Sequence, residues 1–88
     1  MFDGKQILIT GGTGSLGTAL TKYLLKTNVK TIRIFSRDEL KQVNMKEELS
    51  DKRLRFLIGD IRDKDRLYRA VEGIDIVFHA AALKQVPV

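Results

Sequence analysis

The sequence predicts an α/β domain built on a doubly wound parallel sheet, and three observations carry this prediction. Four apolar runs alternate with three stretches of helical spacing along the 88 residues. One helix between each pair of successive strands implies parallel pairing through right-handed crossovers. A glycine-rich segment, Thr10–Gly17, stands between the first strand and the first helix. Together these features predict the first half of such a sheet, with strand order 3-2-1-4.

The four predicted strands differ in character. Lys5–Thr10 and Thr31–Ser36 are short runs rich in β-branched residues, and we expect the first to be buried. The third strand, within Arg53–Asp60, begins with alternating apolar and charged residues, which suits a half-exposed edge position. Ile74–Ala82 is apolar throughout, which predicts an interior strand of a larger sheet. Within this chain, its outer edge is expected to be unpaired.

Apolar residues at three- and four-residue intervals predict the three helices. The first follows the glycines, and we expect its apolar face to turn toward the core. The second, Asp38–Leu49, is polar and has only a weak apolar stripe. The face residues are Leu16, Ala19, Leu20, Tyr23 and Leu24 in the first helix, Leu40, Val43 and Leu49 in the second, and Leu67, Ala70 and Val71 in the third.

The composition limits the classes of function. The chain is 43% hydrophobic and 31% charged, with no cysteine, so it has neither a disulfide framework nor a thiolate metal site. No apolar run approaches the roughly 20 residues of a membrane helix, and we expect a cytoplasmic protein with no membrane partner. The formal net charge of +5 is spread along the chain. This spread favours an anionic small molecule over nucleic acid as the partner.

The glycine-rich segment predicts a dinucleotide-binding loop of a Rossmann-like fold, because ligands bind at the carboxyl ends of the strands in such sheets. Gly11 permits the tight turn from strand into helix. Gly14 allows a pyrophosphate to approach backbone amides at the positive end of the helix, and Gly17 allows that helix to pack close to the strand. A P-loop is rejected because Thr18 stands where its essential lysine would be.

The end of the second strand bears on the choice of cofactor. Arg37 follows the strand directly, where a guanidinium group can reach the 2′-phosphate of NADP in a bidentate contact. Asp38 could instead serve the ribose 2′-hydroxyl of NAD. On a further alternative, Ser36 and Glu39 form a capping box for the next helix, and Arg37 is only its solvated first turn. We favour NADP.

Two further strand ends carry polar residues. Asp60 can accept a hydrogen bond from the adenine amino group while Ile61 packs on the ring, and Asp63 is the expected N-cap of the third helix. His79 is expected to be a packed strand-end residue rather than a catalyst.

The motifs at the strand ends together resemble a known superfamily. TGxxGxxG (Thr10–Gly17), GDIRD (Gly59–Asp63) and HAAA (His79–Ala82) resemble the extended short-chain dehydrogenases/reductases. FSRDELK (Phe35–Lys41) with HAAALKQVP (His79–Pro87) is more narrowly similar to the inverting UDP-N-acetylglucosamine 4,6-dehydratases and their polysaccharide-biosynthesis relatives. Such enzymes are several times longer. We therefore expect residues 1–88 to be the amino-terminal part of an NADP-binding Rossmann domain, without its catalytic and substrate-binding parts.

The resemblance implies a role for each matching residue in binding NADP and a UDP-sugar substrate. Thr13 and Ser15 also carry hydroxyls that can donate to phosphate. The implied residues are Thr13, Gly14, Ser15 and Leu16 at the pyrophosphate, Ser36, Arg37, Asp38, Glu39, Leu40 and Lys41 around the 2′-phosphate, Asp60 and Ile61 at the adenine, Ala80 at the ribose, and Lys84 between cofactor and substrate.

The chemistry implied by the resemblance moves hydride from sugar C4 to NADP, removes water across C5–C6 and returns hydride to C6 with C5 inverted. It requires a Y-x-x-x-K motif, and neither tyrosine of this chain has a lysine at that spacing. We therefore expect the chain to bind cofactor without turnover, with no catalytic or metal-binding residue of its own, in a parent enzyme that is a homo-oligomer. The alternatives are a free-standing dinucleotide-binding module and a related sugar-nucleotide epimerase or reductase.

Overall fold

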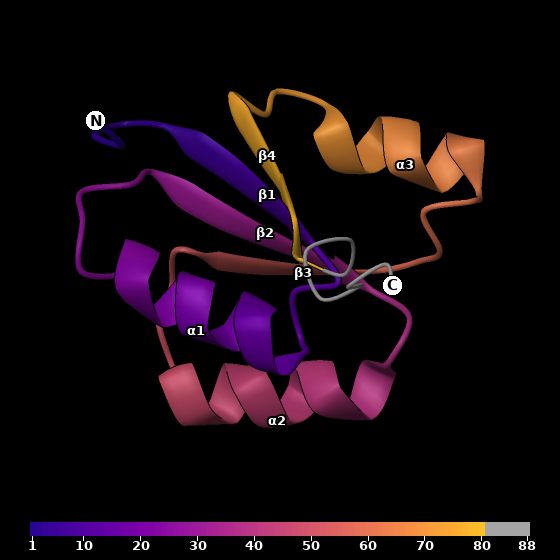
Figure 1. Ribbon diagram of the computed structural model, residues 1–88, viewed down its shortest axis with the longest axis horizontal. Helices are drawn as coiled ribbons and strands as arrows, with labels where there is room; N and C mark the ends of the chain where they lie inside the picture. Colours follow the sequence, from indigo (N-terminus) through magenta and orange to yellow (C-terminus); the bar gives the residue numbers. More distant parts are fainter. Residues whose placement is uncertain (81–88) are drawn as a thin grey trace, which may run out of the picture.

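A four-stranded parallel sheet of order β3-β2-β1-β4 lies at the centre of the computed structural model, which describes residues 1–80 (Figure 1). The α/β class and the strand order predicted from the sequence are confirmed. The elements are β1 (Gln6–Thr10), α1 (Ser15–Leu24), β2 (Thr31–Ser36), α2 (Glu39–Leu49), β3 (Leu54–Ile58), α3 (Lys64–Val71) and β4 (Ile76–His79).

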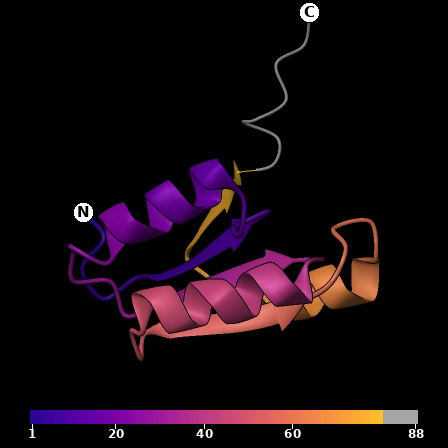
Figure 2. The same ribbon diagram turned by 90° about the horizontal axis from the view of Figure 1, so that it is seen from below.

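The helices cover both faces of the sheet. α1 and α2 lie side by side on one face and α3 lies on the other, as expected for a doubly wound sheet (Figures 1 and 2). β1 is central, and successive side chains enter opposite cores because side chains alternate along a strand. Ile7 and Ile9 pack in the core under α1 and α2, whereas Leu8 packs with Phe35 and Ala70 under α3. The expected burial of the first strand is confirmed.

The two outer strands differ in how well the sequence predicted them. β3 occupies an edge, with Leu54 buried and Arg55 exposed, as the alternation predicted. β4 pairs with β1 alone and forms the other edge of the described sheet, where Val77 is 41% exposed. The strand ends at His79, and Ala81 and Ala82 lie outside the described residues.

The predicted core face of α1 is confirmed at Leu20 and Leu24, which pack in the core, and is wrong at the other three positions. Its buried residues are Gly17, Thr21 and Leu24, whereas Tyr23 is 58% exposed and Leu16 is also exposed. At Gly17 the helix lies so close to the strand–helix turn that there is no room for a Cβ. Thr21 is accommodated in this face because its hydroxyl donates to the Gly17 carbonyl oxygen at 2.8 Å.

The apolar stripe predicted for α2 is wrong at Leu40 and Val43 and confirmed at Leu49, which packs against the core, whereas the stripe of α3 is confirmed. α2 buries Gln42 and Met45 and exposes Leu40 and Val43. A hydrogen-bonded glutamine takes an inward position that an apolar pattern cannot reveal. α3 buries Ala70, with its two predicted neighbours half-buried. None of the helices in residues 1–80 has the length and apolar character needed to cross a membrane.

Candidate functional site

The turn after β1 combines a left-handed glycine with an uncapped helix start. Gly11 has φ +67° and donates its N–H to the Phe35 carbonyl oxygen at 2.8 Å. This backbone conformation favours glycine because the residue has no Cβ. α1 begins at Ser15, and its N-cap, Gly14, provides no side-chain acceptor. The first-turn N–H groups of α1 are therefore left to bind an external acceptor, as at anion sites on helix N-termini.

Two glycines hold this turn tightly between β2 and α1. A Cβ on Gly17 would lie 2.5 Å from Cα of Gly12. A Cβ on Gly12 would in turn lie 2.8 Å from Cγ2 of Ile34. Gly17 therefore packs against the turn itself, rather than against the strand as the sequence suggested. Gly12 was missed by the sequence reasoning, although its place inside the glycine-rich segment was a signal for it.

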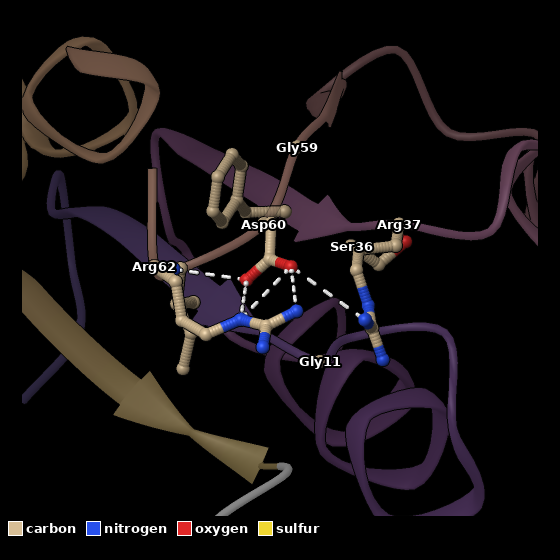
Figure 3. A pocket seen from close by; sticks show the side chains of 8 residues that line it. Gly11, Ser36, Arg37, Gly59, Asp60 and Arg62 are labelled. Carbon is tan, nitrogen blue, oxygen red and sulfur yellow. Dashed lines mark hydrogen bonds and ion pairs between the residues drawn. The ribbon is translucent and has the colours of Figure 1, made fainter. Parts of the chain in front are cut away.

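A cavity of about 390 Å³ opens where β2 and β3 end (Figure 3). It brings together five of the predicted site residues, from three different strand ends. It also contains three residues that the sequence reasoning did not include. The predicted residues are Gly11, Ser36, Arg37, Asp60 and Ile61, and the additional ones are Phe35, Gly59 and Arg62.

Asp60 is the charged centre of this cavity and is paired with two arginines (Figure 3). The Arg62 Nη2 atom lies 2.8 Å from Asp60 Oδ2, and the Arg62 backbone N–H donates to Oδ1 at 2.9 Å. Arg37 approaches Oδ2 from the opposite side at 3.5 Å. The hydrogen bonds from Arg62, with the charge of Arg37, hold the pKa of the Asp60 carboxyl well below its usual range. Two guanidinium groups against one carboxylate leave an excess positive charge at the cavity, which suits an anionic ligand.

A second cavity, of about 610 Å³, lies between α1 and α2. Thr13, Gly14, Ser15 and Lys41 line it, together with Lys22 and Glu48, whose side chains form an ion pair at 3.2 Å. Three of the four residues predicted for the pyrophosphate therefore line a different cavity from Arg37 and Asp60. Because Gly11 lines the first cavity and Thr13 the second, the two cavities flank one turn.

The other predicted site residues that follow β2 lie at the start of α2. Asp38 is the N-cap of α2, and its carboxylate accepts from the Lys41 N–H at 3.0 Å. One oxygen of the Asp38 carboxylate thus caps the helix, as an N-cap residue does. The capping box of Ser36 and Glu39 is wrong, because Ser36 is the last residue of β2. Glu39 lines a groove beside β3, and Leu40 is 69% exposed.

Leu16 and Ala80, which were also predicted as site residues, lie outside both cavities. Leu16 is exposed in the first turn of α1, and Ala80 is buried in the core under α1 and α2. Lys84 lies outside the described residues. Asp63 is the N-cap of α3, as predicted, and accepts from the Arg66 N–H.

His79 ends β4, where its Nδ1 lies 2.7 Å from the hydroxyl of buried Thr10. The residue is exposed rather than packed, because β4 is an edge of the described sheet. The hydrogen bond to Thr10 ties the ends of β1 and β4 together.

The sheet order and the glycine turn define a Rossmann-like α/β protein. Residues 7–88 match the family of polysaccharide biosynthesis proteins, and the chain belongs to that family, as its motifs predicted. It is 54% identical over 89 residues to the UDP-N-acetylglucosamine 4,6-dehydratase (inverting) of Campylobacter jejuni, covering 100% of this chain and 27% of that protein. It is 53% identical over 91 residues to the UDP-glucose 4-epimerase of Rickettsia prowazekii, covering 99% and 27%. The chain thus spans about a quarter of the length of these curated relatives.

Solved structures support the same grouping. Pen from Bacillus thuringiensis matches with a TM-score of 0.89 and 48% identity, over 98% of this chain and 26% of that chain. A short-chain dehydrogenase/reductase from Veillonella parvula in complex with NADP matches with a TM-score of 0.73 and 29% identity, over 85% and 34%. UDP-glucuronic acid 4-epimerase from Bacillus cereus in complex with NAD matches with a TM-score of 0.68 and 29% identity, over 84% and 26%. By their names, these relatives include one dehydratase and two epimerases of UDP-sugars and one short-chain dehydrogenase/reductase.

Proposed function

We propose that this chain is the NADP-binding part of a C5-inverting UDP-N-acetylglucosamine 4,6-dehydratase of bacterial surface-sugar biosynthesis. The single observation that carries the proposal is Arg37 beside Asp60 at the ends of β2 and β3. The adenosine ribose of a dinucleotide lies at the end of the second strand in folds of this kind. The motif pattern supports the dehydratase among the relatives, and the Campylobacter dehydratase is 54% identical to this chain.

Arg37 is suited to a 2′-phosphate. Its side chain is 72% exposed, and its ion pair with Asp60 is long, so the guanidinium group can turn toward a phosphate without losing a strong contact. The planar guanidinium meets phosphate oxygens in a fork that lysine cannot copy. The acid that would read the NAD ribose, Asp38, is instead bonded to the backbone of α2. This arrangement favours NADP over NAD.

The cofactor assignment is tested by calorimetric titration of NADP and NAD against wild type and Arg37→Ala. A charge-assisted contact of this kind predicts roughly ten- to a hundredfold weaker NADP binding in the variant, with NAD nearly unchanged. Arg55→Ala is the matched control, because it removes the same charge from an exposed position on β3 away from the cavity. Equal losses for both cofactors would mean that Arg37 only supports the helix start. A wild type that prefers NAD would overturn the assignment.

The identity to the Rickettsia epimerase keeps an epimerase as the second candidate, and the two reactions differ in product. An enzyme that carries this domain is incubated with UDP-N-acetylglucosamine, and the products are separated by chromatography. A dehydratase gives a 4-keto-6-deoxy sugar nucleotide that has lost one water, whereas an epimerase gives an isomer of unchanged mass. This chain alone, without Y-x-x-x-K, is expected to form neither product above a blank without protein.

A further inference from the structure

A buried glutamine on α2 bonds to both strand ends that form the charged cavity. Gln42 is only 4% exposed, on a helix that is otherwise largely polar and solvated. Its Nε2 group donates to the Leu57 carbonyl oxygen of β3 at 3.0 Å and to the Ser36 hydroxyl of β2 at 2.9 Å. Ser36 is itself 8% exposed and lines the cavity. One side chain therefore connects α2 to the two strand ends beside Arg37 and Asp60.

The direction of these hydrogen bonds follows from the chemistry of the partners. The Leu57 carbonyl can only accept, so the amide nitrogen of Gln42, rather than its oxygen, must face it. The same nitrogen carries a second hydrogen, which is directed at the Ser36 hydroxyl oxygen. Ser36 therefore accepts from Gln42, and its own hydrogen must point elsewhere. Within residues 1–80, that hydrogen has no bonded acceptor, and Ser36 is one of the residues that line the cavity.

We propose that Gln42 is a positioning residue that holds the Ser36 hydroxyl as a hydrogen-bond donor toward the 2′-phosphate of NADP. The inference rests on the NADP site proposed above. A phosphate dianion carries only acceptors, so a hydroxyl fixed as a donor forms a charge-assisted bond with it. The 2′-hydroxyl of NAD can donate or accept, so it gains little from the fixed direction. Gln42 thus contributes to cofactor selection without touching the cofactor.

The test compares NADP and NAD affinities in variants that change the polarity at position 42. Gln42→Glu places an acceptor and a negative charge against Ser36, and should lower the ratio of NADP to NAD affinity at least about tenfold. Gln42→Met deletes the donor without adding charge, and should lower the ratio about threefold. Val43→Glu is the matched control, since it adds the same charge at an exposed neighbouring position. That variant should leave the ratio unchanged.

A double-variant cycle with Ser36→Ala separates positioning from a structural role. If Gln42 acts through Ser36, then Gln42→Met lowers the ratio in wild type and has no further effect in the Ser36→Ala background. Circular dichroism shows which variants fold, and Ser36→Ala alone must lower the ratio even if both Gln42 variants unfold. A wild type without preference for NADP overturns the proposed function and this inference with it. A wild-type preference that persists in Gln42→Met, Gln42→Glu or Ser36→Ala overturns the inference alone.

Discussion

The glycine turn after β1 and the charged cavity at the ends of β2 and β3 are two halves of one candidate site built by opposite means. In the turn, Gly12 and Gly17 matter for the side chains they lack, because an added Cβ would lie 2.8 Å or less from its neighbours. In the cavity, Arg37, Asp60 and Arg62 matter for the charges they carry, and both arginine side chains are at least 72% exposed. We expect changes in the turn to affect folding first and changes in the cavity to affect binding first.

The largest expected effect is that of Gly17→Ala on stability. The new methyl would lie 2.5 Å from backbone Cα of Gly12, and backbone in a tight turn cannot rotate away. Overpacking of this kind costs about 1–3 kcal/mol, partly offset by about 1 kcal/mol of helix propensity gained by alanine. We expect a net loss of about 2 kcal/mol in the free energy of unfolding, because the obstacle is backbone. Thermal unfolding by circular dichroism measures it, with Thr18→Ala on the same helix as the control. If Gly17→Ala melts at the same temperature as the control, the turn tolerates a Cβ, and changes in the turn do not affect folding first.

A smaller effect is expected for Gly59→Ala in the cavity wall. A Cβ there would also lie 2.5 Å from its nearest neighbour, but that neighbour is the ring edge of Phe35. A side chain can shift by a few tenths of an ångström, although Phe35 is fully buried and its core must yield with it. We expect a loss of about 1 kcal/mol, roughly half that of Gly17→Ala. Parallel melting curves decide, and a larger loss than at Gly17 would show that the kind of neighbouring atom does not control the cost.

The sequence predicted the glycine turn well because the signals for this turn are local. The spacing of Gly11, Gly14 and Gly17 lies within one turn, and the alternation of strands and helices determines where that turn must be. The strand order followed for the same reason. Even here the partner of Gly17 was misjudged, since its contact with Gly12 depends on how closely α1 approaches.

The charged cavity was predicted less completely because it depends on tertiary contacts. Arg62 and Gly59 lie next to the predicted Asp60, but nothing in their spacing showed that they would face Phe35 and Arg37 across the cavity. Gln42 was missed because an apolar pattern treats a glutamine as solvated, although its hydrogen bonds satisfy it in the core. For the same reason, the sequence predicted only part of the buried faces of α1 and α2.

The smallest expected effect is the contribution of Asp60 to the pH dependence of stability. Arg62 and Arg37 hold the Asp60 pKa below its usual range in the folded chain. The ionised carboxylate therefore contributes stability above the pKa of an unfolded aspartate, about 3.9, and this contribution is lost as the pH falls toward the folded value.

Between pH 5 and 8, the melting temperatures of wild type and Asp60→Asn should differ by a constant, small amount, because these ion pairs are largely exposed. Below about pH 4, the wild type should lose stability faster, so that the two curves converge. Arg62→Ala removes the main side-chain partner but keeps the backbone hydrogen bond and Arg37, so its acid limb should be intermediate between those of wild type and Asp60→Asn. Melting temperatures recorded in steps from neutral to acid pH measure all three, and curves that stay parallel throughout would show that Asp60 does not stabilise the folded cavity.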